Sequence, residues 1–358
     1  MTRSRNQPLD ILRGMAIFLV LTFHFSYFHW LWQIGWTGVD LFFVLSGFLI
    51  SGLLFDEYSR TGGISLKRFW IRRAFKIYPP YYVLIAVTAA SFLITRGKVP
   101  GRLLSECFFI SNYLPHVWPH MWSLAVEEHF YFMLPLLLVL IIRLKFLRAV
   151  PLVFLSLAVG CLVLRVLEFR MGASAAALHS ETHLRIDSLF SGVAIRYWKT
   201  FYPSSFKRAA AKPLYIPGII LILPALWVAP AGWFMDTAGL SMLYAGYGLL
   251  LVWAVERPPS KNALARSLAW VGKHSYSIYL WHLPLWALLY AAFGRVSLAF
   301  FAIGILSSIG FGACMAWFVE TPSIAIRDKL FPFLGGAGHS ALKGGKHVRA
   351  DCNGYARL

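Results

Sequence analysis

Residues 9–30 read LDILRGMAIFLVLTFHFSYFHW, an apolar run long enough to cross a bilayer as one helix. The run carries Arg13 near one end and His24 near the other, and ionisable side chains inside a membrane span are costly and usually functional. At 100° per residue these two positions share one helix face, roughly 16 Å apart along the axis. A ligand lying along this face could hold a phosphate at Arg13 while its other end reaches His24.

The rest of the chain has the same apolar character. Of its 358 residues, 58% are hydrophobic and 14% are charged, whereas soluble domains have roughly 45–50% and about 25%. We therefore predict an all-α fold, a polytopic membrane helix bundle of about ten transmembrane helices. The expected spans are residues 9–29, 36–56, 78–95, 121–142, 149–168, 185–199, 213–230, 237–255, 274–293 and 298–319.

Basic residues lie at the ends of these apolar runs. The net charge is +19, but this distribution is typical of membrane topology and does not indicate a nucleic-acid partner. With a cytoplasmic N-terminus, 27 of the 34 Lys and Arg residues fall on inside segments and the other 7 on outside segments. We therefore predict that both termini are cytoplasmic and that the protein is a multi-pass protein of the inner (cytoplasmic) membrane, surrounded by membrane lipid.

The chain divides into a transmembrane domain over residues 1–330 and a cytoplasmic tail over residues 331–358, which is rich in Gly, Lys and His and is expected to be disordered. No small-residue cleavage site follows the first apolar run, so we expect that run to be retained. The four cysteines lack CxxC spacing, and the sequence has neither an HExxH helix nor a hydrolase elbow. We therefore expect acid–base chemistry without a metal.

Three basic residues precede the third predicted span, in the run FWIRRAFKIYPPYY of residues 69–82. Arg and Lys at a helix entrance favour phosphate, Arg through a bidentate fork and Lys as a point charge. Arg73 and Lys76 are i, i+3 neighbours on one face and join Arg13 as predicted phosphate ligands. Arg72 is a further candidate, although it could equally set the topology or contact anionic lipid.

A second set of polar residues is expected toward the outer face: His24, Asp40, Glu127, Glu128, Arg185 and Asp187. Asp187 could simply cap a helix N-terminus, and Asp40 could be a structural partner of a neighbouring amide or of Arg185. The carboxylates of Glu127 and Glu128 point to different helix faces, so each needs a partner of its own.

His24 has two possible roles. A lone buried histidine is more often structural than catalytic. A carboxylate at similar depth, however, could orient the imidazole and leave its other nitrogen free as a general base. His282, near mid-membrane in the ninth predicted span, is a second candidate, and it could instead hold a neighbouring helix.

These stretches together resemble the acyltransferase 3 family of integral-membrane O-acyltransferases, over residues 9–322. The family's opening Arg and His match Arg13 and His24, and its RxxR pair matches Arg73 and Lys76, where Lys replaces the second Arg. The other matching blocks are GVDLFFVLSGFLI (38–50), the RRxxRIxPxYY block (72–82), WSLxxExxFY (122–131), RxDxLxxG (185–192), SYSxYLxHxP (275–284) and Glu-x-Pro (320–322).

The resemblance implies an acyltransferase that transfers groups other than aminoacyl groups. It implies cytoplasmic acyl-CoA, which we expect to be acetyl-CoA, as donor, and a hydroxyl of an extracytoplasmic or lipid-linked carbohydrate of the envelope as acceptor. His24 would be the general base, with Glu127 or Asp40 orienting its ring; Arg13, Arg72, Arg73 and Lys76 would bind the donor; and Glu128, Arg185, Asp187 and His282 would contact substrate. O-acylation of a secreted metabolite or glycolipid, or proton-coupled transport, are the alternatives.

Overall fold

All regular secondary structure in residues 6–332, the part of the chain that this computed structural model describes, is helical, and that part contains no strand. The first half contains α1 (Gln7–His24), α2 (His29–Gly35), α3 (Gly38–Thr61), α4 (Leu66–Arg96), α5 (Leu103–Cys107), α6 (Met121–Arg143), η1 (Leu147–Ala149), α7 (Val150–Arg170) and α8 (Ala175–Ser180). The second half contains α9 (Thr182–Phe201), α10 (Pro203–Ala210), α11 (Tyr215–Ile222), η2 (Leu223–Leu226), η3 (Met235–Gly239), α12 (Leu240–Ala254), α13 (Ala263–Lys273), α14 (Ser275–Phe293), α15 (Leu298–Met315), η4 (Ala316–Glu320) and α16 (Thr321–Leu330).

Six helical stretches are long and apolar enough to cross a membrane, and the pair α10 and α11–η2, bent by 72°, makes a seventh if it is one span. The six are His29–Thr61, Leu66–Arg96, Met121–Arg143, Leu147–Arg170, Met235–Ala254 and Leu298–Leu330. A multi-pass helical membrane protein is therefore confirmed, whereas the count of ten is not. Three further predicted spans correspond to α1, α9 and α14, which are not among these stretches. The sides on which the termini lie stay a prediction, and most of the predicted tail lies outside the described residues.

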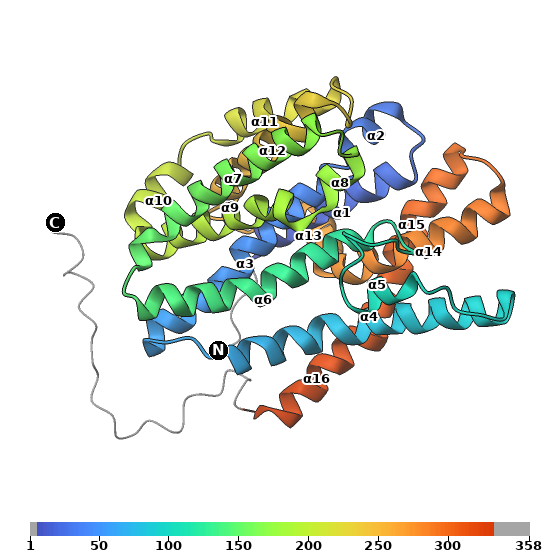
Figure 1. Ribbon diagram of the computed structural model, residues 1–358, viewed down its shortest axis with the longest axis horizontal. Coiled ribbons are helices and arrows are strands. Elements are labelled where there is room, and N and C mark those ends of the chain that lie inside the picture. Colours follow the sequence, from blue (N-terminus) through green and yellow to red (C-terminus); the bar gives the residue numbers. More distant parts are fainter. Residues whose placement is uncertain (1–5, 333–358) are drawn as a thin grey trace.

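The helices pack around α1 and α3. Helices α10, α11 and α12 lie on one side of this pair, and α4 and α16 lie on the other (Figure 1). Helices α3 and α9 run in the same direction. Asp40 pairs with Arg185 near the start of both helices (2.6 Å), and Asp56 pairs with Arg196 near the end of both (2.8 Å). We call the end of the bundle where α1 ends and α3 and α9 begin the far end.

Two glycines allow α3 and α9 to approach closely. A Cβ on Gly47 would lie 1.8 Å from the carbonyl oxygen of Leu189, and one on Gly192 would lie 2.2 Å from that of Val44. Small residues at such crossings let helix backbones pack against each other inside a membrane, where lipid supplies no hydrophobic drive between helices. This contact fixes the position of α3, which carries much of the site described below.

We expect Gly47→Ala to lower the free energy of unfolding by about 1–3 kcal/mol, because the added methyl group forces two backbones apart. Thermal unfolding of the purified protein in nanodiscs measures this. Gly160→Ala on α7 is the matched control, since nothing lies within 4 Å of a Cβ there and alanine has the better helix propensity. A Gly47→Ala variant as stable as the Gly160→Ala variant would contradict the close packing.

Candidate active site

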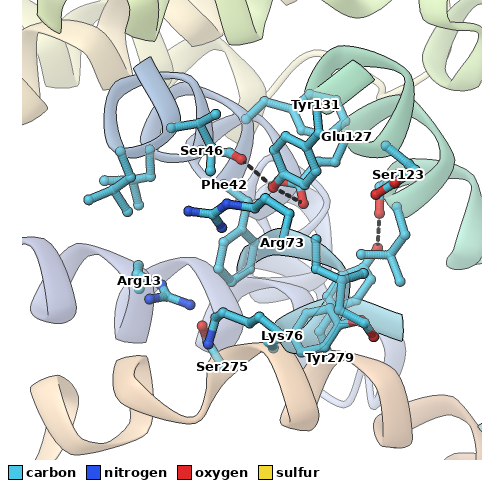
Figure 2. Close-up of a pocket in the computed structure, with 18 of the residues that line it drawn as sticks. Arg13, Phe42, Ser46, Arg73, Lys76, Ser123, Glu127, Tyr131, Ser275 and Tyr279 are labelled. Atoms are coloured by element: carbon cyan, nitrogen blue, oxygen red, sulfur yellow. Dashed lines mark hydrogen bonds between the residues drawn. The ribbon is translucent and has the colours of Figure 1, made fainter. Parts of the chain in front are cut away.

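A cavity of about 270 Å³ lies between α1, α3, α4, α6 and α14 (Figure 2). Apolar side chains of α3, including Phe42, Leu45 and Leu49, form much of its wall. Its polar lining consists of Arg13, Ser46, Arg73, Lys76, Ser123, Glu127, Glu128, Tyr131, Ser275, Tyr276 and Tyr279. The cavity therefore combines apolar walls with a group of charged side chains from three different helices, α1, α4 and α6.

Three cationic side chains from two helices point into the same space, as predicted (Figure 2). Arg13 comes from α1, and Arg73 and Lys76 come from α4, where their i, i+3 spacing places both on the inner face. The guanidinium of Arg73 lies 5.7 Å from the centre of the Tyr131 ring, and Lys76 Nζ lies 2.5 Å from Glu320 Oε1. Three cations therefore lie beside one small cavity, whose lining also includes the carboxylates of Glu127 and Glu128.

Arg72 does not point into the cavity as Arg73 does. Its side chain is exposed and lies outside the cavity, because adjacent residues on a helix point about 100° apart. The prediction that Arg72 binds the donor together with Arg73 therefore has no support from this geometry. The structure agrees with the other interpretation of Arg72, as a residue that sets topology or contacts anionic lipid.

Glu127 and Glu128 have separate partners, as their adjacent positions require, yet both line the cavity. The Tyr131 hydroxyl donates to Glu127 (2.9 Å) and is hydrogen-bonded to Ser46 (2.7 Å), while Glu128 accepts from the Tyr78 hydroxyl. Glu127 was expected at the depth of His24, but it lies beside the cations. The reason is that α6 begins inside the bundle, and seven residues of helix carry Glu127 about 10 Å toward the basic side chains.

His24 is the last residue of α1, and its ring lies against the ring of His282, with centroids 4.8 Å apart. His24 Nδ1 donates to the carbonyl oxygen of Val20 at 3.0 Å. Since a carbonyl oxygen can only accept, this bond places the proton on Nδ1 and leaves a lone pair on Nε2. The continuous helix from Gln7 to His24 also confirms that Arg13 and His24 share one helix.

A third histidine, which sequence reasoning missed, completes this cluster. His120 precedes α6, and its ring centroid lies 4.9 Å from that of His282. Its Nε2 donates to the carbonyl oxygen of Leu280 at 3.2 Å. Pro284, four residues further along α14, has no N–H to offer that carbonyl. The available signal was the position of His120 directly before an apolar helix that carries a recognised motif.

The expectation that Asp40 or Glu127 orients the His24 ring is wrong. Within residues 6–332, neither Asp40 nor Glu127 is hydrogen-bonded to the His24 ring. The reason is that Asp40 pairs with Arg185, both about 1% exposed, and Glu127 bonds to Tyr131. A backbone carbonyl and the packed ring of His282 hold the His24 ring instead.

Asp187 and Arg185 also lie outside the cavity lining. Asp187 does not cap its helix, because α9 begins at Thr182. It pairs at 3.0 Å with Arg165 of α7, and both side chains are 0% exposed. Arg165 had been counted only as a topology residue. Asp40 and Asp187 are therefore the buried counter-ions of two arginines.

Tyr279 forms the wall between the cavity and the histidines. It lines the cavity, and its ring centroid lies 5.4 Å from that of His282, one helical turn away on α14. Its hydroxyl donates to the carbonyl oxygen of His120 (2.9 Å) and is hydrogen-bonded to Ser123 (2.5 Å). The cationic cavity thus ends against the histidine cluster, although His24 itself lies behind this wall.

A family model for an acyltransferase domain matches residues 6–317. The chain belongs to the acyltransferase 3 family. Every predicted site residue lies within the matched range, and Glu320, the partner of Lys76, lies just beyond it. The matched range thus contains both the cationic cavity and the histidine cluster.

Two relatives show how far the similarity extends. The chain is 30% identical over 308 residues to the peptidoglycan O-acetyltransferase OatA of Listeria monocytogenes, covering 77% of this chain and 49% of the relative. It is 28% identical over 357 residues to the O-acetyltransferase OatA of Staphylococcus aureus, covering 91% of this chain and 58% of the relative. The chain therefore spans about half the length of these curated relatives. No solved structure matches it.

Proposed function

We propose that this protein is a membrane O-acyltransferase that moves an acyl group, expected to be acetyl, from acyl-CoA to a hydroxyl of an envelope glycan or glycan precursor. The observation that carries this proposal is the cavity itself, which joins three cations at Arg13, Arg73 and Lys76 to a wall that backs onto His24 and His282. Membership of the acyltransferase 3 family and the names of the relatives support the same reaction.

The cavity suits one part of such a donor. Its volume of about 270 Å³ is at the small end of ligand sites, so it would hold the slender arm of acyl-CoA rather than the nucleotide. The phosphates would lie against Arg13 and Arg73, because guanidinium groups bind phosphate through paired hydrogen bonds. Lys76, already paired with Glu320, would add a point charge. The apolar side chains of α3 would surround the arm.

His24 would act as the general base in a direct transfer. Its Nε2 would take the proton of the acceptor hydroxyl while the hydroxyl oxygen attacks the thioester carbonyl carbon. The new C–O bond forms as the C–S bond breaks, and the leaving thiolate takes up the proton from His24. The bond from Nδ1 to Val20 would hold the tautomer that this step needs. Movement of Tyr279 would be required to bring donor and base together.

The orientation predicted from the basic residues would make this reaction vectorial. The cations would face the cytoplasm and bind the donor, while the far end of the bundle would face the acceptor. Sealed vesicles of known orientation test this, with acetyl-CoA on one side and a membrane-impermeant acceptor on the other. We expect product only when acetyl-CoA is on the cytoplasmic side and the acceptor is opposite. Product that requires both on the cytoplasmic side would refute the scheme.

Arg73→Ala should weaken acetyl-CoA binding by about tenfold to a hundredfold, the range for losing a charged hydrogen bond. Arg72→Ala is the matched control, because it removes the same charge from the adjacent, exposed position, and its affinity should stay within about twofold. Equilibrium binding to the protein in nanodiscs measures both. Equal losses in the two variants would show that Arg73 contributes only general surface charge.

The reaction itself is tested by incubating the purified protein with radiolabelled acetyl-CoA and soluble peptidoglycan fragments. We expect acceptor-dependent consumption of the thioester and label in the glycan as an alkali-labile ester. A protein that moves protons or solutes across the membrane without consuming thioester would be a transporter, and that result would overturn the proposed function.

A further inference from the structure

The far end of the bundle holds an imidazole–carboxylate pair that the reaction described above does not use. His179 of α8 and Asp236 of η3 lie with Nε2 and Oδ1 2.8 Å apart. The Asp236 side chain is 3% exposed, whereas that of His179 is 20% exposed. This is the arrangement that the sequence led us to expect at His24, a buried carboxylate that orients an imidazole, and it occurs here instead.

Asp236 is held firmly in place. Its Oδ2 accepts the backbone N–H of Gly232 at 2.9 Å, and its own N–H donates to the Gly232 carbonyl oxygen at 2.9 Å. Asp236 also lies in the π-helical turn Met235–Gly239, a distortion of the helix that is frequent at functional sites. A charged Asp236 accepts the proton of His179 Nε2, which leaves a lone pair on Nδ1. Among the described residues, none donates a hydrogen bond to that nitrogen.

An aromatic ring lies against the His179 ring. The Trp36 and His179 ring centroids are 5.1 Å apart, with an angle of 31° between the rings. Trp36 Nε1 donates to the carbonyl oxygen of Gln33, and the Gln33 amide donates to that of Val228, at 3.0 and 2.8 Å. These bonds tie Trp36 to the loop that leads to Asp236. Trp36 and His179 therefore form one fixed surface, in which both side chains are partly exposed and the indole also packs against the apolar core.

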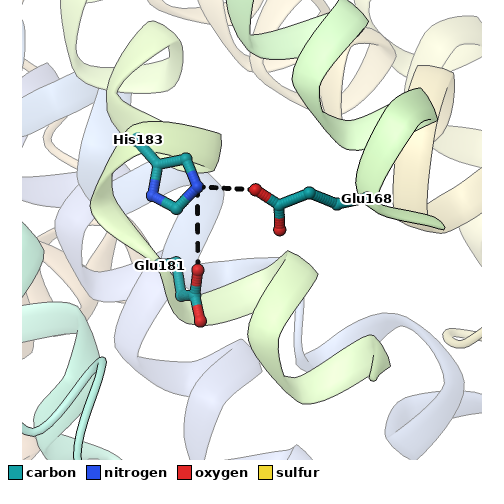
Figure 3. Close-up of side chains that lie close together, drawn as sticks. All are labelled: Glu168, Glu181 and His183. Atoms are coloured by element: carbon teal, nitrogen blue, oxygen red, sulfur yellow. Dashed lines mark hydrogen bonds and ion pairs between the residues drawn. The ribbon is translucent and has the colours of Figure 1, made fainter. Parts of the chain in front are cut away.

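A second histidine at the same end, His183, also lies beside carboxylates and serves as a comparison (Figure 3). His183 Nε2 lies 2.7 Å from Glu168 Oε1 and 3.7 Å from Glu181 Oε2, and its Nδ1 is hydrogen-bonded to the Tyr113 hydroxyl at 3.0 Å. The 2.7 Å separation is that of a direct hydrogen bond. Both nitrogens of His183 are engaged, whereas His179 keeps Nδ1 available. His179 therefore keeps a ring nitrogen available to a ligand, whereas His183 does not.

We infer that His179, Asp236 and Trp36 form a carbohydrate-binding subsite that holds the acceptor glycan at the far end of the bundle. His179 Nδ1 accepts a sugar hydroxyl, and the C–H face of the sugar ring lies on the indole of Trp36. A carbohydrate fits because it offers hydroxyl donors and an apolar face together. The identity of the glycan as acceptor rests on the proposed function, but its binding does not require transfer.

Asp236→Asn is the informative variant, because an amide can donate to Nε2 and thereby move the histidine proton to Nδ1, which converts the acceptor into a donor. The probe is a soluble N-acetylglucosamine–N-acetylmuramic acid tetrasaccharide, titrated into the full-length protein in nanodiscs. We expect Asp236→Asn and Trp36→Ala to raise its Kd about fivefold to tenfold, as for one lost hydrogen bond or contact. The Kd for acetyl-CoA should stay within about twofold.

Glu168→Gln is the matched control, since it makes the same change beside His183 and should leave the tetrasaccharide Kd unchanged. No binding to the wild type, or equal affinities for wild type, Asp236→Asn and Trp36→Ala, would overturn the subsite. Binding that follows the expected pattern without any acetyl transfer would preserve the subsite and refute the proposed function. Acetyl transfer by the wild type, with the same tetrasaccharide Kd in the wild type and the variants, would refute the subsite and preserve the proposed function.

Discussion

His24→Ala is expected to lower the rate of acyl transfer by about 10²- to 10⁴-fold, the usual cost of losing a general base. The reason is the tautomer that the structure imposes, with the proton of Nδ1 bonded to Val20 and the lone pair on Nε2. Acetyl-CoA binding should change little, because the cations that line the cavity remain. Initial rates with saturating acetyl-CoA, together with equilibrium binding of acetyl-CoA, measure the two effects separately.

His29→Ala is the matched control for this experiment. His29 begins α2, five residues beyond His24, and its side chain is exposed. Its loss should leave the rate within about twofold of the wild type. A His24→Ala variant that inserts normally and turns over at the wild-type rate would show that His24 is structural and that another group removes the proton.

Arg165→Ala is expected to lower the free energy of unfolding by about 3–5 kcal/mol, because it leaves Asp187 as a buried charge without its counter-ion. Arg165 also donates to the Leu184 carbonyl oxygen (2.6 Å) and to Ser241 (2.7 Å), so one side chain joins α7, α9 and α12. Thermal and denaturant unfolding in nanodiscs measures the loss, and reduced yield in the membrane fraction should accompany it.

Two comparisons test the reason as well as the size of this effect. The double variant Arg165→Met with Asp187→Leu removes both charges and should recover much of the stability, since apolar replacements of buried pairs are often tolerated. Arg196→Ala breaks the ion pair between Arg196 and Asp56, whose side chains are 18% and 17% exposed, respectively. This change should lower the free energy of unfolding by about 1 kcal/mol or less. An Arg165→Ala variant no less stable than Arg196→Ala would contradict this account.

Residues close together in the sequence were placed correctly from the sequence. The spacing of Arg13 and His24 on one apolar run, and the i, i+3 spacing of Arg73 and Lys76, were enough to put each pair on one helix face. The same geometry would have excluded Arg72 from the cavity, because a neighbour in sequence points about 100° away. Helical periodicity is local, so these relations do not depend on the rest of the fold.

The depth of a residue proved harder to infer than its face. The sequence placed Glu127 near His24, but α6 begins inside the bundle and carries Glu127 to the cations. Apolar runs predicted a multi-pass helical protein, yet they did not show where each helix begins within the membrane. Of the ten predicted spans, those at α1, α9 and α14 are not among the six or seven stretches that are long and apolar enough to cross a membrane.

Composition and helical periodicity determined the class of the protein, the apolar spans and the faces on which neighbouring charges lie. The tertiary structure alone decided which charge meets which partner. It selected Arg185 for Asp40, a pairing that the sequence left open, and it paired Asp187 with Arg165 and His179 with Asp236 across separate helices. Inside a membrane each buried charge needs a partner, but no periodicity in the sequence specifies which one, because that choice depends on how the helices cross.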